Sequence, residues 1–362
     1  MTIMSKNKTQ GPDVTPHLEF LERNGILPDP SSATFVPKIN PEKDVVSHVD
    51  WDRLFPAARL GENHDPERPW LSEDEWQPEL NEEFLSELGR ILEGGDYHNP
   101  TPSCVWDGSL PCEEQTSHWD SCAWYRPIHY FGSDWGILIK QSCAERKALR
   151  IARFLARSLS PYLTSRWDLW AIGKWLIKIS FLKYFLHEHF HHKVESLGFR
   201  FHVIFGASLY LPYKDAVYRK HFLTSDCLEE SLANADAYRR LGNKPYVSHI
   251  GKAWLPRVRD YLEFIDFPSC PPGYKEALHY LKDDDFNKKL HLLHGQMKEA
   301  TLTPSQPVDD WVLASRLTQS MFNVKSRIWE VVPRGRSALL PTTSCKSKLA
   351  TSASAYHKMH VL

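Results

Sequence analysis

The spacing of apolar residues predicts helices along most of the chain. Over residues 78–95 a leucine or phenylalanine recurs at four-residue steps, which places these side chains on one helix face before two glycines end the pattern. A second pattern covers residues 143–159, and a longer one covers 165–197 and ends at Gly198. Shorter helices are predicted over residues 211–222, 228–241 and 308–321 and within 253–297.

A small sheet is predicted from two further patterns. Residues 122–140 are aromatic and β-branched on both sides of a turn sequence at 132–134, as in a β-hairpin. Pro127 lacks an N–H group, which confines the first arm to an edge or a bulge. The second arm, 135–140, is either a core strand or an edge that receives a substrate peptide. Because residues 199–206 alternate as a short strand does, the sequence indicates a mainly helical α+β fold with one small sheet.

Composition divides the chain into three parts. Residues 1–75 are rich in proline and acidic residues and show no sustained periodicity, which indicates an extended or partly ordered N-terminal arm. Short apolar pieces around Trp51 and Trp70 are expected to pack onto the body. Residues 76–332 hold the periodic segments and form the expected main domain. Residues 333–362 are small, polar and basic, and indicate a loosely ordered C-terminal tail.

Overall composition indicates a globular protein without a strong electrostatic preference. Lysine plus arginine number 44 against 45 acidic residues, and 42% of residues are hydrophobic. Residues 167–186 are long enough to span a bilayer, but three lysines interrupt them, so a buried helix and no membrane contact are expected. The N-terminus lacks the apolar run of a secretory signal, and the seven cysteines include no C-x-x-C pair. We therefore expect a cytoplasmic protein with reduced thiols.

A row of arginines on the predicted helix 143–159 offers a charged surface. Arg146, Arg150, Arg153 and Arg157 follow one another at helical spacing, opposite the apolar side chains. Such a stripe is either an ordinary solvated face or a binding site for an acidic or nucleic-acid partner.

The strongest chemical signal is the stretch FLHEHFHHKVE in the long helix. His187 and His191 lie one turn apart, so their imidazoles project from the same face and can bind one metal ion. Glu188 completes the pattern H-E-x-x-H, in which the glutamate reaches the water and not the metal, and zinc is the usual partner. His189 and His192 point around the helix and are expected to be exposed polar residues.

A catalytic zinc of this kind needs a third protein ligand, often a glutamate from another helix. The segment EESLANA opens a predicted helix about forty residues downstream and supplies Glu230 as the preferred candidate. Glu229 and Glu195 are the alternatives. Glu195 lies four residues past His191, where it would bind the metal or steady that histidine.

The combination of H-E-x-x-H with a following helix that contains E-x-x-A-[N/D] resembles the glutamate-zincin metallopeptidases. The resemblance is to the ImmA/IrrE-type regulatory proteases and to the HtpX-like and prenyl-protein endopeptidases, and it covers residues 187–238. In those families the glutamate that opens E-x-x-A-[N/D] is the third zinc ligand, which corresponds to Glu230 here. Asn234 completes the motif and is expected to hydrogen-bond the back of a ligand histidine.

The resemblance implies a zincin-like domain and an intracellular zinc-dependent endopeptidase that hydrolyses a peptide bond in a specific protein partner. Zn2+ would lower the pKa of a bound water from about 15.7 toward 7, and Glu188 would act as general base and return the proton to the leaving amine. The oxyanion needs one further donor. Residues chemically able to supply it are Tyr218, His221, Tyr238, Arg239 and His249.

Two other functions fit the same residues. A zinc hydrolase that acts on a non-peptide bond would use the same metal chemistry. A non-enzymatic or nucleic-acid-binding protein would instead use the arginine stripe and bind metal only incidentally. A rival metal cluster of Cys104, Cys112, His118 and Cys122 matches no zinc-ribbon spacing, so these are expected to be ordinary thiols.

Overall fold

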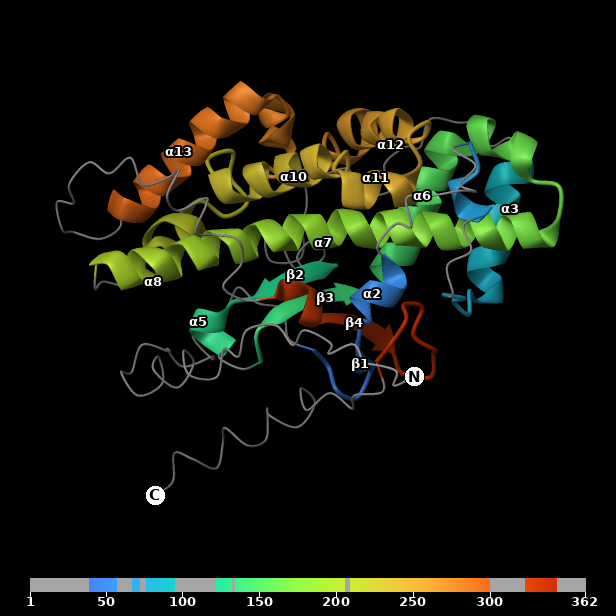
Figure 1. Cartoon of the computed structure of the whole chain (residues 1–362), viewed down its shortest axis with the longest axis horizontal. Helices are drawn as coiled ribbons and strands as arrows, with labels where there is room; N and C mark the ends of the chain where they lie inside the picture. The colour runs from blue at the N-terminus through green and yellow to red at the C-terminus, as the bar shows by residue number, and fades with distance from the viewer. Residues whose placement is uncertain are drawn as a thin grey trace, which may run out of the picture.

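Helix α7 (Arg166–Phe205) organises the fold of this computed structural model. It is 40 residues long and crosses the width of the molecule (Figure 1). The sheet lies on one side of α7, and on the other lie α10 (Leu228–Arg240), α11 (Lys244–Ile250), α12 (Leu255–Tyr261) and α13 (Asp283–Glu299). The structure describes residues 39–56, 67–71, 76–94, 122–131, 134–205, 209–299 and 323–343.

The sheet joins segments from both ends of the described chain. Its spatial order is β1 (Asp44–His48), β4 (Ile328–Pro333), β3 (Gly136–Lys140) and β2 (Ala123–Arg126). β4 pairs antiparallel with β1 and parallel with β3, while β2 pairs antiparallel with β3. The predicted mainly helical α+β fold is confirmed. Because β1 comes from the predicted N-terminal arm, part of that arm is built into the body.

The remaining elements complete the helical part of the molecule. The α-helices are α2 (Trp51–Leu54), α3 (Glu82–Glu93), α5 (Ile128–Phe131), α6 (Gln141–Leu159), α8 (Tyr210–Tyr213) and α9 (Arg219–His221). The 3-10 turns are η2 (Pro69–Leu71), η4 (Ser160–Tyr162), η7 (Lys275–Tyr280) and η8 (Val324–Ser326), and the π-helical turns are η5 (Lys214–Tyr218) and η6 (Leu262–Asp266). The helix predicted over 308–321 lies outside the described residues.

The predicted hairpin exists, but its two arms have different surroundings. α5 stands between β2 and β3, directly after Pro127, and β2 is the terminal strand of the sheet as that proline requires. β3 pairs on both sides, so residues 135–140 are a core strand and the idea that they receive a peptide by edge pairing is wrong.

The predictions of a helix end at Gly198 and of a strand over 199–206 are wrong, because α7 continues to Phe205. Phe199 and Phe201 are both buried, because this part of α7 is covered on all sides. The alternation of apolar and polar residues therefore does not mark a buried and an exposed face. Gly198 serves packing: a Cβ atom there would lie 2.7 Å from the Cβ of Tyr210. The glycine therefore allows α8 to approach α7 closely.

The three lysines within residues 167–186 of α7 are buried inside the protein. Lys174 and Lys178 lie over the ring of Trp76 at 5.6 and 5.4 Å, and Lys183 faces the buried carboxylate of Asp266 at 3.7 Å. Among the described residues, no helix is both long and apolar enough to cross a bilayer. The reading of 167–186 as a core helix agrees with this burial.

The prediction of reduced thiols is wrong for one pair. Cys122 and Cys143 form a disulfide, with their Cα atoms 5.4 Å apart. Pairing of β2 with β3 brings the two together, because α6 starts where β3 ends. Disulfides are typical of oxidising compartments, and the expected cytoplasmic location stays a prediction. Cys227 and Cys270 are free and buried, while Cys104, Cys112 and His118 lie outside the described residues.

The arginine stripe on α6 is partly engaged within the molecule. Arg150 donates to the Ser269 hydroxyl at 3.0 Å, and Arg153 donates to the Glu87 carboxylate at 2.7 Å. Arg146 is exposed and contacts the sulfur of Cys143. Since the two central arginines hold internal partners, the stripe does not present a uniformly solvated basic face.

Candidate metal centre

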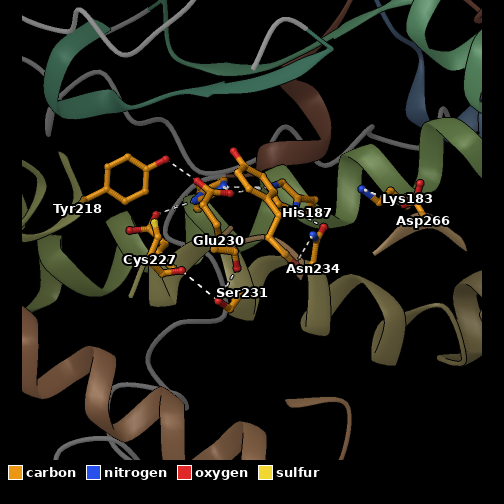
Figure 2. A network of polar contacts seen from close by, with 12 residues as sticks. Lys183, His187, Tyr218, Cys227, Glu230, Ser231, Asn234 and Asp266 are labelled. Atoms are coloured by element: carbon orange, nitrogen blue, oxygen red, sulfur yellow. Dashed lines mark hydrogen bonds and ion pairs between the residues drawn. The ribbon is translucent and has the colours of Figure 1, made fainter. Parts of the chain in front are cut away.

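Two packed helices bring the predicted site residues together. α7 carries His187, Glu188 and His191, and α10 carries Glu230 and Asn234 in its first two turns. Figure 2 shows His187 beside Glu230 and Asn234. His191 follows His187, and Asn234 follows Glu230, by four residues, so each helix presents a pair of side chains one turn apart. All five side chains are buried.

Three potential ligand atoms converge between the helices. The Nε2 atom of His187 lies 3.1 Å from Oε2 of Glu230, and the Nε2 atom of His191 lies 3.4 Å from the same oxygen. The two Nε2 atoms are 3.3 Å apart. Ligands about 2.1 Å from a tetrahedral zinc ion lie roughly 3.4 Å from one another. The triangle of His187, His191 and Glu230 therefore has the dimensions of one face of a zinc coordination tetrahedron.

A side-chain amide fixes the orientation of His187. The Nδ2 group of Asn234 donates to the backbone carbonyl of Tyr274 at 3.1 Å, so its Oδ1 atom is the end that faces His187. That oxygen accepts a hydrogen bond from Nδ1 of His187 at 2.9 Å. With its proton on Nδ1, the neutral imidazole directs the Nε2 lone pair toward Glu230.

A buried ion pair orients His191 in the same way. Nδ1 of His191 lies 2.6 Å from Oε1 of Glu229, which also accepts from Lys214 at 3.0 Å. The hydroxyl of Tyr213 donates to the other Glu229 oxygen at 2.7 Å. Glu229, the first fallback ligand, is thus held behind His191 and does not face the converging atoms.

The convergence of acceptors calls for a positive charge between them. Burial opposes the charged form of His191, but Glu230 and Glu229 outweigh it and raise the pKa of His191 to about 10. Burial alone would raise the pKa of Glu230, whereas the neighbouring histidines hold it well below its usual range. One proton on His191 can bridge only one of the three short contacts. A divalent cation would satisfy all three at once.

The second oxygen of Glu230 is held from the opposite side. The Tyr218 hydroxyl donates a hydrogen bond to Oε1 of Glu230, which leaves Oε2 to face the histidines (Figure 2). Burial, reinforced by the Glu230 charge, raises the pKa of Tyr218 well above its ordinary value, so it remains a donor. Tyr218 lies at the site, but its hydroxyl is committed to Glu230 and not to a substrate oxygen.

The other predicted oxyanion donors lie elsewhere. The His221 ring, at the end of α9, faces an aspartate of the following turn at 3.9 Å, and the Tyr238 hydroxyl donates to a glutamate of η6 at 3.4 Å. Arg239 donates to an aspartate of α13 at 3.1 Å, and the His249 ring packs against Phe55. These contacts direct all four side chains to partners other than the three converging atoms.

Glu195, the second fallback ligand, is committed to another part of the fold. Its carboxylate accepts hydrogen bonds from the Tyr125 hydroxyl, the backbone N–H groups of Ile128 and His129, and the His129 ring. Burial works against its charge, but these donors hold the pKa of Glu195 below its usual range. Glu195 thus fixes the turn after β2, so the expectation that it binds the metal or steadies His191 is wrong.

The two remaining histidines of the stretch were predicted to be exposed, and that prediction is wrong. His192 is 1% exposed, stacks on Trp135 at 5.1 Å, and shares a hydrogen bond with the Tyr125 hydroxyl at 2.9 Å. His189 is half-buried and lies 2.6 Å from a guanidinium nitrogen of Arg240. Both pack against neighbouring elements because α7 is enclosed by the sheet on one side and by α10, α11, α12 and α13 on the other.

Glu188 is placed beside the converging atoms without being one of them. It is 6% exposed, and burial raises the pKa of its carboxyl, although the adjacent His187 and His191 oppose that shift. A carboxyl with a raised pKa can exchange a proton nearer to neutral pH than an ordinary glutamate. Glu188 directly follows His187 in the chain, and both His187 and His191 act electrostatically on its carboxyl.

Tyr213, Lys214 and Tyr274 also belong to the centre and were not recognised from the sequence. They come from segments that flank α10, and no fixed spacing links them to the histidines. No model of a known protein family matches the chain, and comparisons with curated proteins and with solved structures likewise give no significant match. Function is therefore argued from the site alone.

Proposed function

We propose that this protein is a zinc-dependent endopeptidase that hydrolyses a peptide bond in a protein partner. His187, His191 and Glu230 would hold the Zn2+ ion, and Glu188 would act as general base. The observation that carries the proposal is the convergence of these three ligand atoms at 3.1 to 3.4 Å, each on a side chain whose far end is tied to another group.

The chain's own residues would divide the chemistry between them. Asn234 and Glu229 hold the imidazoles with Nε2 turned inward, so little rotational freedom is lost when a metal binds. Glu188 accepts a proton from the attacking water and gives it to the amine that leaves. The zinc ion would supply Lewis-acid activation of the water and the substrate carbonyl.

The sheet offers a place for an extended peptide. β2 is the terminal strand in the order of the described strands, and its Tyr125 contacts His192 of α7, one residue beyond the ligand His191. An extended segment that pairs with a terminal strand gains main-chain hydrogen bonds regardless of its sequence. β2 would therefore be the strand that pairs with a substrate peptide, a role that residues 135–140 cannot take.

Metal content measured by elemental analysis tests the proposal. Wild type should contain near-stoichiometric zinc, and Glu230→Ala should lose it. Glu188→Gln should keep the zinc but lose cleavage of a mixed peptide library, because only the base is removed. The matched control is Glu263→Gln, which alters a half-buried carboxylate in contact with α10 but outside the centre. Wild type that binds no zinc even after refolding with it would overturn the proposal.

A zinc hydrolase that acts on a non-peptide bond is the second candidate. The same ligands and base would serve it, because the metal chemistry does not depend on which bond is hydrolysed. Cleavage of ester or amide probes, with the peptide library left intact, would select this candidate. The nucleic-acid reading has less support, because Arg150 and Arg153 already hold internal partners.

A further inference from the structure

The disulfide between Cys122 and Cys143 joins the start of β2 to the first turn of α6. Cys122 directly precedes β2, and Cys143 is the third residue of α6. The two cysteines differ in exposure, because Cys143 is 2% exposed whereas Cys122 is half-buried. A small thiol in solution therefore has easier access to Cys122 than to Cys143.

A guanidinium group lies beside this disulfide. Arg146 donates to the Sγ atom of Cys143 at 3.0 Å, while the Sγ atom of Cys122 lies farther from the same arginine, at 3.9 Å. A positive charge next to sulfur and a place in the first turn of a helix each stabilise a thiolate. If the S–S bond breaks, negative charge is therefore better stabilised on Cys143 than on Cys122.

β2 is held in the sheet by contacts other than the disulfide. It pairs with β3 along its length, and the Cys122 carbonyl accepts from the Lys140 N–H at 2.8 Å. Just beyond β2, the N–H groups of Ile128 and His129 donate to the buried Glu195 carboxylate at 2.9 and 2.8 Å. Since both ends of β2 keep these hydrogen bonds without the disulfide, the S–S bond can open in the folded protein.

We propose that Cys122 and Cys143 form a thiol-exchange site, at which a small thiol of the glutathione class attacks Cys122 and Cys143 leaves as a thiolate beside Arg146. This site lies outside the candidate metal centre and does not depend on the proposed hydrolysis. An exposed disulfide whose leaving sulfur is stabilised as a thiolate exchanges readily, whereas a structural disulfide resists reduction by glutathione.

The exchange proceeds in two displacements. In the first, the external thiolate bonds to the sulfur of Cys122, the S–S bond breaks, and its electron pair goes to Cys143. In the second, another external thiolate attacks the external sulfur of the mixed disulfide and releases Cys122, which takes up a proton from water. The protein disulfide gains two electrons, and two external thiols are oxidised to one disulfide.

Reaction of the folded, full-length protein with reduced glutathione tests the site. Samples are quenched with acid at intervals, free thiols are alkylated, and peptides are identified by mass spectrometry, which distinguishes Cys122 and Cys143 from the other cysteines. We expect the disulfide to open while the far-UV circular dichroism of the protein is retained. Glutathione should be found on Cys122 in the early samples.

Substitutions of Arg146 test the stabilisation of the leaving sulfur. Arg146→Gln should slow the opening about 2- to 5-fold, the effect expected from one exposed charge. Arg146→Lys keeps the charge and should react at nearly the wild-type rate. The matched control is Arg157→Gln, which removes an exposed arginine of the same helix about 16 Å farther along and should leave the rate unchanged.

Three results would contradict the proposal. A disulfide that glutathione opens only after the protein is unfolded in urea is structural and not a site of exchange. Glutathione found on Cys143 in place of Cys122 would show that the other sulfur is attacked, and this result is read in wild type whether or not a variant folds. Equal rates in folded wild type and folded Arg146→Gln would refute the stabilisation of the Cys143 thiolate by Arg146.

Discussion

Replacement of Asn234 by alanine isolates the contribution of one orienting hydrogen bond to metal binding. Asn234 is fully buried, accepts from Nδ1 of His187 at 2.9 Å, and donates to the Tyr274 carbonyl at 3.1 Å. The substitution removes both contacts but leaves His187, His191 and Glu230 in the chain. The His187 ring is then free to rotate or to move its proton to Nε2, where it blocks the metal.

The size of the effect on zinc affinity and on folding stability follows from the two hydrogen bonds that are lost. Loss of a hydrogen-bond partner behind a ligand histidine weakens metal binding about 10- to 100-fold, or about 1.4–2.7 kcal/mol. Nδ1 of His187 also loses its buried partner, at a cost to folding stability of about 1–3 kcal/mol, and loss of the part-buried contact with the Tyr274 carbonyl adds to that cost. Asn234→Ala should therefore fold less stably and bind zinc more weakly.

Zinc affinity should be measured by competition with a chromophoric chelator, and stability by urea unfolding of the metal-free protein. Ser231→Ala is the matched control: Ser231 is buried on the same helix and bonds the Gly273 carbonyl, but it touches neither histidine. The control should lose stability and keep its zinc affinity. If Asn234→Ala binds zinc as tightly as wild type while His187→Ala does not bind it, the orienting role of Asn234 is refuted.

Three further predictions concern the fold. Gly198→Ala should lower the free energy of unfolding by about 1–2 kcal/mol in urea titrations, because the 2.7 Å contact with Tyr210 outweighs the gain in helix propensity; equal stability would contradict the packing role. Burial raises the pKa of Glu330 to about 8 from an ordinary 4.5. Folded protein therefore binds a proton that unfolded protein has lost, and stability should fall as pH rises from about 4.5 to about 8, by up to about 5 kcal/mol. In unfolding curves at pH 5 and pH 8, Glu330→Gln should lack that part of the pH dependence. If the stability changes between the two pH values by the same amount in wild type and variant, the prediction is refuted. Replacing Cys122 and Cys143 by alanine should cost about 3 kcal/mol for their separation of 21 residues, measured under non-reducing conditions, and the same loss should appear in wild type after reduction.

The residues of the candidate centre could be predicted because short, local spacings in the sequence define them. A turn of helix separates His187 from His191 and Glu230 from Asn234, so two short patterns define two pairs of side chains. Packing of α7 against α10 then brings the pairs together as the resemblance implied. Glu195 shows the limit of this reasoning, since its spacing from His191 suits a ligand equally well. Only the turn after β2, which surrounds its carboxylate with donors, decides its role.

Features that depend on distant segments left no local pattern. Gly198 has the sequence context of a helix end, but the approach of Tyr210 gives it a packing role inside α7. The disulfide between Cys122 and Cys143 depends on the register of β2 with β3, and the spacing of the cysteines along the sequence does not reveal it. Tyr274 is placed by a glycine turn against α10. In each case the deciding contact joins residues whose separation in sequence carries no periodic signal.

The charges around the centre favour an electrophilic metal over a merely structural one. Glu229 and Glu230 are adjacent carboxylates in the same buried space, but Lys214 lies 3.0 Å from Glu229 and balances its charge. The histidines are neutral when they bind metal, so Glu230 alone would contribute a negative charge to a dication. The centre would therefore keep a net positive charge in a buried setting, which strengthens its pull on a carbonyl or water oxygen. Structural zinc sites, by contrast, close all four positions with protein ligands. Here the converging atoms supply three. Under the proposed function, water would take the fourth position and Glu188, the neighbour of His187 in the chain, would accept its proton.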